Sequence, residues 1–251
     1  MTVELVDLSA IPGLTISEPT TGSSKFSTLI YGRMKSGKSY LAATAADVAQ
    51  MGPVLWIAGE DGTSSFGDKY GDKIDVVHPR NAQQVLDLVK KLTDVDEKGK
   101  LKFPTKYKTI VVDTIGAYQN MVKRDYLAKN KDGSFEMWGL VGSMITEITN
   151  LVHKSPYNLI LLAHHEKVKD ETEGKLLIMP HMLGKTAIQD IPPIVDNVFY
   201  LAKVEGEDGK PVRVLQTQGT SRIDAGGRFE GKVPSQMVNP TFQEIYNFIT
   251  A

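Results

Sequence analysis

Cysteine is absent from this sequence of 251 residues. Its absence excludes a disulfide framework, a zinc finger, an iron–sulfur cluster and a cysteine nucleophile. Long hydrophobic runs are lacking as well: the longest have about five or six residues, whereas a helix needs about 20 apolar residues to span a bilayer. We therefore expect no transmembrane helix and no membrane partner.

A large charge of either sign is also lacking. Twenty-nine Lys and Arg residues offset 30 Asp and Glu residues, for a net charge of −1. Any nucleic-acid partner must therefore be bound by a local basic patch and not by the overall field. With 41% hydrophobic residues the composition is that of an average globular protein, which excludes a disordered chain. Met1–Ser9 lack the basic and apolar regions of a signal peptide, so we expect a cytoplasmic protein.

Short apolar segments alternate with amphipathic ones along the first two-thirds of the chain. The segments rich in β-formers are continuous apolar runs, as expected for strands of a sheet with both faces covered. This alternation predicts an α/β fold in which helices flank a mostly parallel central sheet. The expected strands are Phe26–Tyr31, Val54–Ala58, Ile74–Val77, Thr109–Asp113 and Asn158–Ala163, and the expected helices are Ser39–Gln50, Ala82–Leu92 and Met137–His153.

The end of the chain follows a different pattern. Val195–Val204 and Val212–Thr217 are two β-forming runs around a charged turn, which predicts a C-terminal antiparallel hairpin. We divide the chain into an N-terminal arm (residues 1–24), a core (residues 25–225) and a C-terminal segment (residues 226–251). The last segment is expected to pack on the core or on a neighbouring subunit.

One motif dominates the sequence. Residues 32–39 fit the pattern G-x-x-x-x-G-K-[ST], between a predicted strand and a predicted helix. Glycines let successive backbone N–H groups face an anion, and the helix adds its N-terminal donors and dipole. Lys38 would reach the β- and γ-phosphates and the Ser39 hydroxyl would bind Mg²⁺, which predicts ATP and Mg²⁺ as cofactors. The alternative is a glycine-rich turn that binds nothing. The expected nucleotide-binding residues are Gly32, Arg33, Met34, Lys35, Ser36, Gly37, Lys38, Ser39 and Tyr40.

A second metal ligand is expected at the end of a buried strand. Asp113 closes the run Ile110–Asp113, and a carboxylate at the C-terminal end of a central strand lies beside the phosphate loop. We predict that Asp113 holds Mg²⁺ or its water together with Ser39. The alternative is a helix cap, because Thr114 and Gly116 follow.

The acid that activates water is missing from the position where P-loop ATPases of the AAA+ type usually place it, directly after the metal-binding Asp. Thr114 stands there instead. Glu60 is the best candidate, because it follows the strand Val54–Ala58 and would point toward the γ-phosphate if that strand neighbours the phosphate-loop strand. Asp61 is the second candidate, and an acid in a surface turn is the alternative.

Two histidines, His164 and His165, close the fifth predicted strand. A polar side chain at this place can sense the γ-phosphate. Adjacent side chains on a strand point to opposite faces, so at most one of the two reaches the site. The alternative is a solvated pair at the strand end.

The order of these parts resembles the ATPase core of the RecA/RadA superfamily. After the phosphate loop and Glu60, the segment Asp75–Leu92 looks like the strand and helix that precede the metal-binding strand there. The segment Asp196–Arg222 resembles the end of the RadA core. The resemblance covers about residues 26–225 and implies a RecA-like ATPase core.

Within that superfamily the sequence looks most similar to small RecA-like ATPases encoded by bacteriophages, some of which act in single-strand annealing or recombination. Trp138-Gly139 and Ala163-His164 are similar to their pattern. Carried over by position, the resemblance implies that His164 senses the γ-phosphate, that Glu60 activates water and that Arg222 contacts the nucleotide. Residues 219–222 lack the Lys that opens the RadA basic motif, which weakens the assignment of Arg222.

The resemblance also implies a homo-oligomer, ring or filament, in which Lys185 or Arg222 completes the neighbour's nucleotide site. It implies single-stranded DNA as a partner, held by loops at about residues 118–138 and 166–185. For the aromatic side chains Phe135 and Trp138, burial in the following helix is the stronger expectation than base stacking. The basic residues of these loops are Lys123, Arg124, Lys129, Lys131, Lys167, Lys169 and Lys175.

The sequence thus predicts a RecA-like protein that binds and hydrolyses Mg-ATP and acts on single-stranded DNA in phage-type recombination, annealing or replication. One alternative is a small-molecule kinase, against which the sequence shows no arginine-rich lid segment. Another is a nucleotide-switched adaptor without DNA-dependent turnover.

Overall fold

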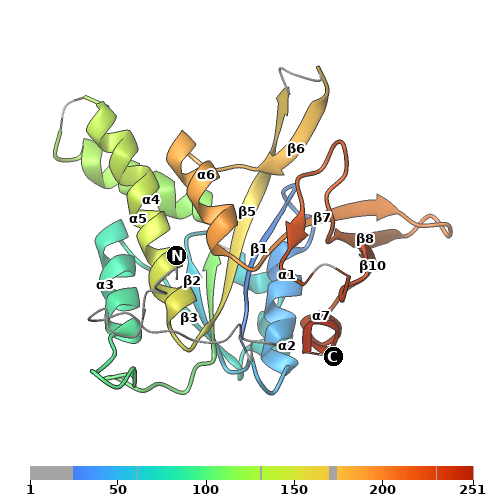
Figure 1. Ribbon diagram of the computed structural model, residues 1–251, viewed down its shortest axis with the longest axis horizontal. Helices are drawn as coiled ribbons and strands as arrows, with labels where there is room; N and C mark the ends of the chain where they lie inside the picture. Colours follow the sequence, from blue (N-terminus) through green and yellow to red (C-terminus); the bar gives the residue numbers. More distant parts are fainter. Residues whose placement is uncertain (1–24, 61, 131, 170–173, 230, 251) are drawn as a thin grey trace, which may run out of the picture.

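The computed structural model describes residues 25–250, except residues 61, 131, 170–173 and 230 and the side chain of Lys185. Within these residues the chain forms a ten-stranded sheet in the order β10-β8-β7-β1-β5-β4-β2-β3, with β6 paired to β5 and β9 paired to β7 (Figure 1). The parallel strands are β1 (Ser27–Gly32), β2 (Val54–Ala58), β3 (Ile74–Val77), β4 (Thr109–Asp113), β5 (Asn158–Lys169) and β7 (Asn197–Glu205).

At one end of the sheet the strands are antiparallel, and they come from the C-terminal part of the chain. There β7 pairs with β8 (Pro211–Gln216), and β8 pairs with β10 (Gln236–Val238). The short strand β9 (Gly226–Gly227) also pairs with β7. The α/β fold with a mostly parallel sheet and a C-terminal antiparallel hairpin is therefore confirmed.

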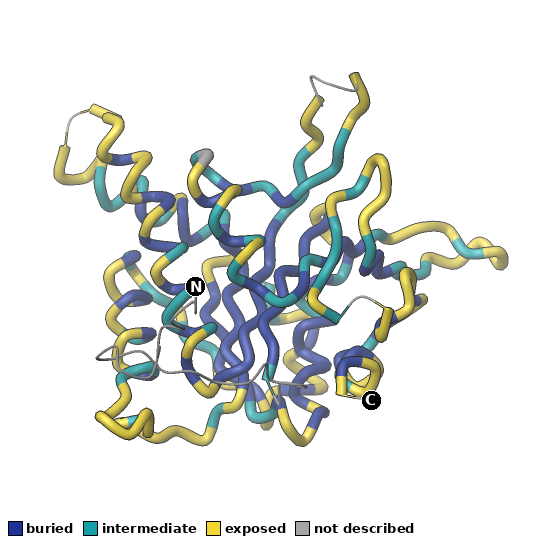
Figure 2. The backbone as a smooth tube through the Cα atoms, viewed as in Figure 1, coloured by how far each residue is buried: buried dark blue, intermediate teal, exposed yellow. Residues whose placement is uncertain are grey.

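Helices cover both faces of the sheet, as the continuous apolar strands predict. Within β1, Leu29 and Tyr31 pack into the core on one face, and Ile30 packs into the core on the other. Figure 2 shows the central strands buried between these layers. The first face carries α3 (Ala82–Thr93), α4 (Ile115–Leu127), α5 (Phe135–Lys154) and α6 (Lys185–Ile194), and the second carries α1 (Lys38–Ala43), α2 (Gly67–Tyr70) and α7 (Phe242–Thr250).

The strand order brings the predicted site residues to one edge. β1 lies between β7 and β5, with Gly32 opposite His164, and β4 lies between β5 and β2, with Asp113 opposite Ala58. The condition that the sequence analysis attached to Glu60, that Val54–Ala58 neighbours the phosphate-loop strand, is not met, because β5 and β4 lie between the two strands. The carboxyl ends of all these parallel strands still meet at the same edge.

The first helix is shorter than the sequence predicts. The alanine-rich segment was expected to be helical over Ser39–Gln50, but α1 ends at Ala43 and a 3₁₀ turn, η2 (Thr44–Asp47), follows. The Thr44 hydroxyl donates to the carbonyl of Leu41 (2.7 Å) and accepts the backbone N–H of Phe242 in α7 (2.8 Å). A contact with the end of the chain thus accompanies the break in this helix.

Two hairpins project from the carboxyl edge (Figure 1). The helices α4 and α5 form the first, and β5 with β6 (Leu176–Pro180) forms the second. The segments at about residues 118–138 and 166–185 were both expected to be loops. Both descriptions are corrected here: most of the first segment is helical, and β5 continues to Lys169 as one arm of a β-hairpin. No helix among the described residues has the length and apolar character needed to cross a membrane.

Candidate functional site

The phosphate loop joins β1 to α1. Lys35 and Gly37 have positive φ angles of 62° and 97°, so the backbone curls between Gly32 and the first turn of the helix. Gly32 leaves no room for a side chain, because a Cβ there would overlap the backbone carbonyl oxygen of Leu201 in β7. The loop is therefore shaped by its own glycines and by close contact with the neighbouring strand.

Lys38 is buried at the start of α1. Its ammonium donates hydrogen bonds to the carbonyls of Gly32 (3.2 Å) and Arg33 (3.0 Å), so it lies across the loop. Burial lowers the pKa of Lys38, and the nearby carboxylates of Asp113 and Glu60 act in the opposite direction. This geometry places the ammonium where an anion held by the loop would be contacted.

Ser39 and Asp113 form the candidate metal site. The Ser39 hydroxyl donates to Asp113 Oδ2 at 2.9 Å, and Asp113 is 3% exposed at the end of β4. Burial raises the pKa of Asp113, whereas the hydrogen bond from Ser39 lowers it. Mg²⁺ prefers a few protein oxygens together with phosphate and water, so this hydroxyl–carboxylate pair fits it.

Two further observations fit a bound nucleotide. The Ser36 hydroxyl is buried in the loop with no hydrogen-bond partner among the described residues, as expected of a group that awaits an anion. A Cβ on Gly62 would lie 3.6 Å from both Ser39 Oγ and Asp113 Oδ2, so the absence of a side chain there leaves the metal pair uncovered.

The structure brings Glu60 and His164 together from two different strands. His164 Nε2 lies 3.4 Å from Glu60 Oε1, and the same oxygen accepts a hydrogen bond of 2.7 Å from the Thr114 hydroxyl. Glu60 and His164 are 44% and 30% exposed, so water reaches both. Asp61, the second candidate for this role, lies outside the described residues.

Only one of the adjacent histidines faces this group. The ring of His165 stacks on Tyr200, with 6.0 Å between the ring centroids, and Tyr200 is on β7. Burial lowers the pKa of His165. The expectation that at most one histidine reaches the site agrees with this geometry.

Sequence reasoning missed Arg213, which lies against the phosphate loop. A Cβ on Gly37 would come within 2.9 Å of Arg213 Cδ, and the guanidinium carbon is 5.4 Å from the ring centre of Tyr40. Its Nε is buried without a hydrogen-bond partner among the described residues. No local signal identifies Arg213, because only the pairing of β8 with β7, which borders β1, brings it here.

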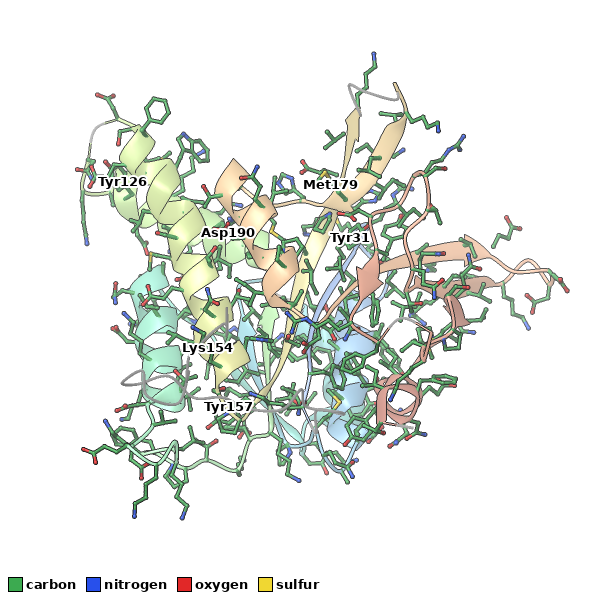
Figure 3. All side chains as sticks on the ribbon, viewed as in Figure 1. Tyr31, Tyr126, Lys154, Tyr157, Met179 and Asp190 are labelled. Carbon is green, nitrogen blue, oxygen red and sulfur yellow. The ribbon has the colours of Figure 1, made fainter. Side chains whose placement is uncertain are left out.

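The two candidates for completing a neighbour's site lie elsewhere. Arg222 lines a cavity of about 460 Å³ at the β5–β6 hairpin together with Lys167 and Ile178, and Ile178 donates its N–H to the carbonyl of Arg222 at 2.7 Å. In Figure 3 the labels of Met179 and Tyr31 mark the base of this hairpin, where the Tyr31 hydroxyl donates to Ile178 and Asp224 carbonyls. Lys185 is the first residue of α6, and its side chain is outside the described part.

The predicted DNA-binding segments are two hairpins and not loops. At the tip of α4–α5, marked by Tyr126 in Figure 3, Phe135 is 97% exposed and Trp138 is 41% exposed. The expectation that these two rings are buried is wrong, because the buried face of α5 begins at Met137 and continues at Val141, on the other side of the helix. The Lys123 ammonium lies 5.3 Å from the centre of the Trp138 ring.

Comparison with known proteins identifies the family of the chain. A family model described as an AAA domain matches residues 24–229, which is most of the chain. The chain belongs to the AAA domain family. With its phosphate loop, its strand order and its antiparallel C-terminal hairpin, it has the fold of a RecA-like P-loop NTPase.

Solved structures are similar to the chain only at low identity. A KaiC-like protein, PH0186 from Pyrococcus horikoshii OT3, is 15% identical over 86% of this chain and 89% of that one, with a TM-score of 0.47. A RadB recombinase is 15% identical over 78% of this chain and 80% of that one, with a TM-score of 0.46. A search of curated proteins finds no match.

Proposed function

We propose that this AAA-domain protein binds and hydrolyses Mg-ATP, and that it does so on single-stranded DNA. The observation that carries the ATPase part is the convergence of Lys38, the Ser39–Asp113 pair and Glu60 at one edge of the sheet. These groups follow three different strands, β1, β2 and β4, and a loop that binds nothing would not require them to meet.

Each side chain has a separate task in this proposal. The loop N–H groups and Lys38 bind the phosphates, and Ser39 with Asp113 holds Mg²⁺, which neutralises charge on the phosphate oxygens. Glu60 accepts a proton from the attacking water, and its exposed position supports that role. His164, 3.4 Å from Glu60, links this carboxylate to the middle of β5.

The DNA part of the proposal rests on the exposed tip of the α4–α5 hairpin. Phe135 and Trp138 face solvent there, and Lys123 lies on the Trp138 ring. Bases of a single strand stack on exposed aromatic rings, at about 1–3 kcal/mol per base, while lysines contact the backbone phosphates. The second segment, at about residues 166–185, also holds Lys167, Lys169 and Lys175, but Asp170, Glu171 and Glu173 offset their charge, so its electrostatic support for DNA binding is weak. We place the reaction in recombination, annealing or replication.

Assembly is a further part of the proposal. In a ring or filament, Arg222 or Lys185 of one subunit would reach the γ-phosphate held by the next. A cation supplied by a neighbour completes the site only on assembly, so that turnover depends on oligomer formation. Size-exclusion chromatography with and without Mg-ATP measures the oligomeric state of the protein.

The first experiment is steady-state ATP hydrolysis with and without oligo-dT. We expect DNA to stimulate turnover, Lys38→Ala to abolish it, and Glu60→Gln to lower kcat by about 10²- to 10⁴-fold while nucleotide binding is retained. Lys98→Ala, at an exposed lysine in a remote loop, is the control. Nucleotide binding without turnover would instead favour the adaptor, and phosphate release only with an added hydroxyl acceptor would favour the kinase.

The proposed DNA surface has its own test. Trp138→Ala should weaken the binding of labelled oligo-dT by about 1–3 kcal/mol, measured by fluorescence anisotropy at fixed salt. Phe248→Ala is the matched control, since Phe248 is an exposed aromatic (38%) on α7 at another part of the molecule. Equal affinity of both variants and the parent protein would remove the α4–α5 tip from the DNA site.

A further inference from the structure

Thr114 is the residue that holds the carboxylate of Glu60. It directly follows Asp113, is 2% exposed, and donates its hydroxyl proton to Glu60 Oε1 at 2.7 Å. In the sequence, Thr114 stands where a glutamate is usual and next to a possible helix cap. The structure shows that this position remains connected to the acid, although the acid now comes from the end of β2.

The direction of this hydrogen bond follows from a count of protons. A threonine hydroxyl has one proton to donate and two lone pairs that accept. Thr114 is the N-cap of α4, and its Oγ1 accepts the backbone N–H of Ala117 at 3.3 Å. An ionised carboxylate only accepts, so the single hydroxyl proton points at Glu60.

The backbone around Glu60 is tied to the same helix end. The N–H of Gly59 donates to the carbonyl of Asp113 at 2.6 Å, and a Cβ on Gly59 would lie 2.8 Å from the Ala117 Cβ. The turn that carries Glu60 therefore packs directly on the first turn of α4. A movement of this helix end would be transmitted to Glu60.

Both side-chain contacts of the Glu60 carboxylate are made to one oxygen. Thr114 and His164 both approach Oε1, and among the described residues no side chain makes a hydrogen bond or ion pair to Oε2. The carboxylate is therefore oriented with one oxygen held by the protein and the other directed away from these partners. This is the arrangement that a base needs to accept a proton from a water molecule.

We infer that Thr114 is a positioning residue for Glu60, and that it couples the orientation of this carboxylate to the first turn of α4. The inference rests on the role of Glu60 in the proposed function. Thr114 holds Oε1, which leaves Oε2 to accept the proton of the attacking water. Because α4 leads into the α4–α5 hairpin, the same contact connects that hairpin to the base.

Thr114→Val tests this inference, because it keeps the size of the side chain and removes the hydroxyl. We expect kcat to fall by about 10- to 100-fold, as for other residues that orient a reacting group. The KM for ATP should stay within about twofold, because Lys38, Ser39 and Asp113 are unchanged. Thr114→Ser keeps the hydroxyl and should restore most of kcat.

A double-mutant cycle separates positioning from a general structural role. Once Glu60→Gln has removed the base, adding Thr114→Val should change kcat by less than about twofold, because its partner no longer acts. A merely structural role would instead lower kcat by the same factor in both backgrounds. Additive effects would overturn the inference.

A substitution at the cap of another helix controls for the loss of the Thr114 cap. Asn81 caps α3 by accepting the N–H of Gln84 at 2.9 Å and does not contact the site. Asn81→Ala should reduce thermal stability through the loss of its cap, yet leave kcat unchanged. Thr114→Ala provides a second variant without a methyl group against the carboxylate, and it should show the same loss of kcat.

The possible outcomes distinguish a failure of the proposed function from a failure of the role assigned to Thr114. If Glu60→Gln leaves turnover unchanged, Glu60 is not the base and the proposed mechanism itself fails. If Glu60→Gln lowers kcat but Thr114→Val and Thr114→Ala match the parent protein, the role of Glu60 stands and the role of Thr114 is overturned.

Discussion

Single residues at the site carry charges that burial makes unfavourable. Lys38 and Asp113 are both buried. Burial lowers the pKa of Lys38 and raises the pKa of Asp113, so it favours the neutral form of each side chain. Each charge offsets part of the cost of the other. A bound Mg-nucleotide would add the missing counter-charges, so this part of the molecule is arranged for binding rather than for the stability of the free protein.

Asp113→Asn should therefore stabilise the nucleotide-free protein while removing the metal ligand. A raised pKa means that the ionised form costs folding free energy above that pKa, so at pH 7 the substitution should raise stability by on the order of 1 kcal/mol. We expect the Tm to rise by about 2–4 °C, and the further rise with Mg-ATP to be lost. Asp94→Asn, at an exposed acid paired with Lys102, is the control in the same thermal scan. A lower Tm of the nucleotide-free Asp113→Asn protein would contradict this account.

Gly37→Ala tests how closely Arg213 packs on the phosphate loop. A φ of 97° strains any side-chain residue by about 1–2 kcal/mol, and the new methyl group would also displace Arg213. In an Arg213→Ala background the displacement disappears and only the backbone strain remains. Urea unfolding of the parent protein, the two single variants and the double variant measures how much Gly37→Ala lowers the free energy of unfolding in each background. An equal loss with and without Arg213 would rule out the contact between Arg213 and the loop.

At the scale of elements, the local sequence pattern predicted the strands more accurately than the helices. β2, β3 and β4 begin and end at the predicted residues. β2 and β4 are continuous apolar runs buried on both faces, whereas β3 is the edge strand and only its Ile74 is fully buried. The helices α4 and α6 were not predicted. α6 contains Pro192 and Pro193, which argue against a helix in any local analysis and are accommodated near its C-terminal end.

The C-terminal helix α7 is an element of the core of its own chain. Phe242 is fully buried, stacks on Phe26 with 6.1 Å between the ring centroids, and donates its N–H to Thr44. Phe242→Ala should lower the free energy of unfolding by about 3–5 kcal/mol in urea titrations. Phe248→Ala, on the exposed side of the same helix, should change it by less than about 0.5 kcal/mol. Similar effects of both substitutions would show that α7 does not pack as described.

For the whole molecule, partly buried histidines make stability depend on pH. Burial lowers the pKa of His153, which lies between β1 and the end of α5, and that of His165 beside Tyr200. The unfolded chain protonates these groups near their ordinary pKa of about 6.5, before the folded chain does. Their contribution to stability is therefore complete above that pH and is lost as the pH falls from it toward the folded-state pKa.

Thermal unfolding between pH 8 and pH 5.5 checks this sign. We expect the Tm of the parent protein to fall below about pH 6.5, and the fall to be smaller in a His153→Gln, His165→Gln double variant. His78→Gln, at an exposed histidine, should follow the parent curve. A double variant with an undiminished fall would assign the pH dependence to other groups.

The sequence alone determined the parts that depend on neighbours along the chain. The phosphate loop from Gly32 to Ser39 and the buried strands are encoded within a few residues each, and so is the acid at the end of β4. Only the tertiary structure decided which of these parts meet, because strand order depends on pairs far apart in the chain, such as Ser27 with Leu159. The insertion of β5 between β1 and β4, the contacts of Thr114 and His164 with Glu60, and the approach of Arg213 to Gly37 all follow from that long-range pairing, which no local pattern specifies.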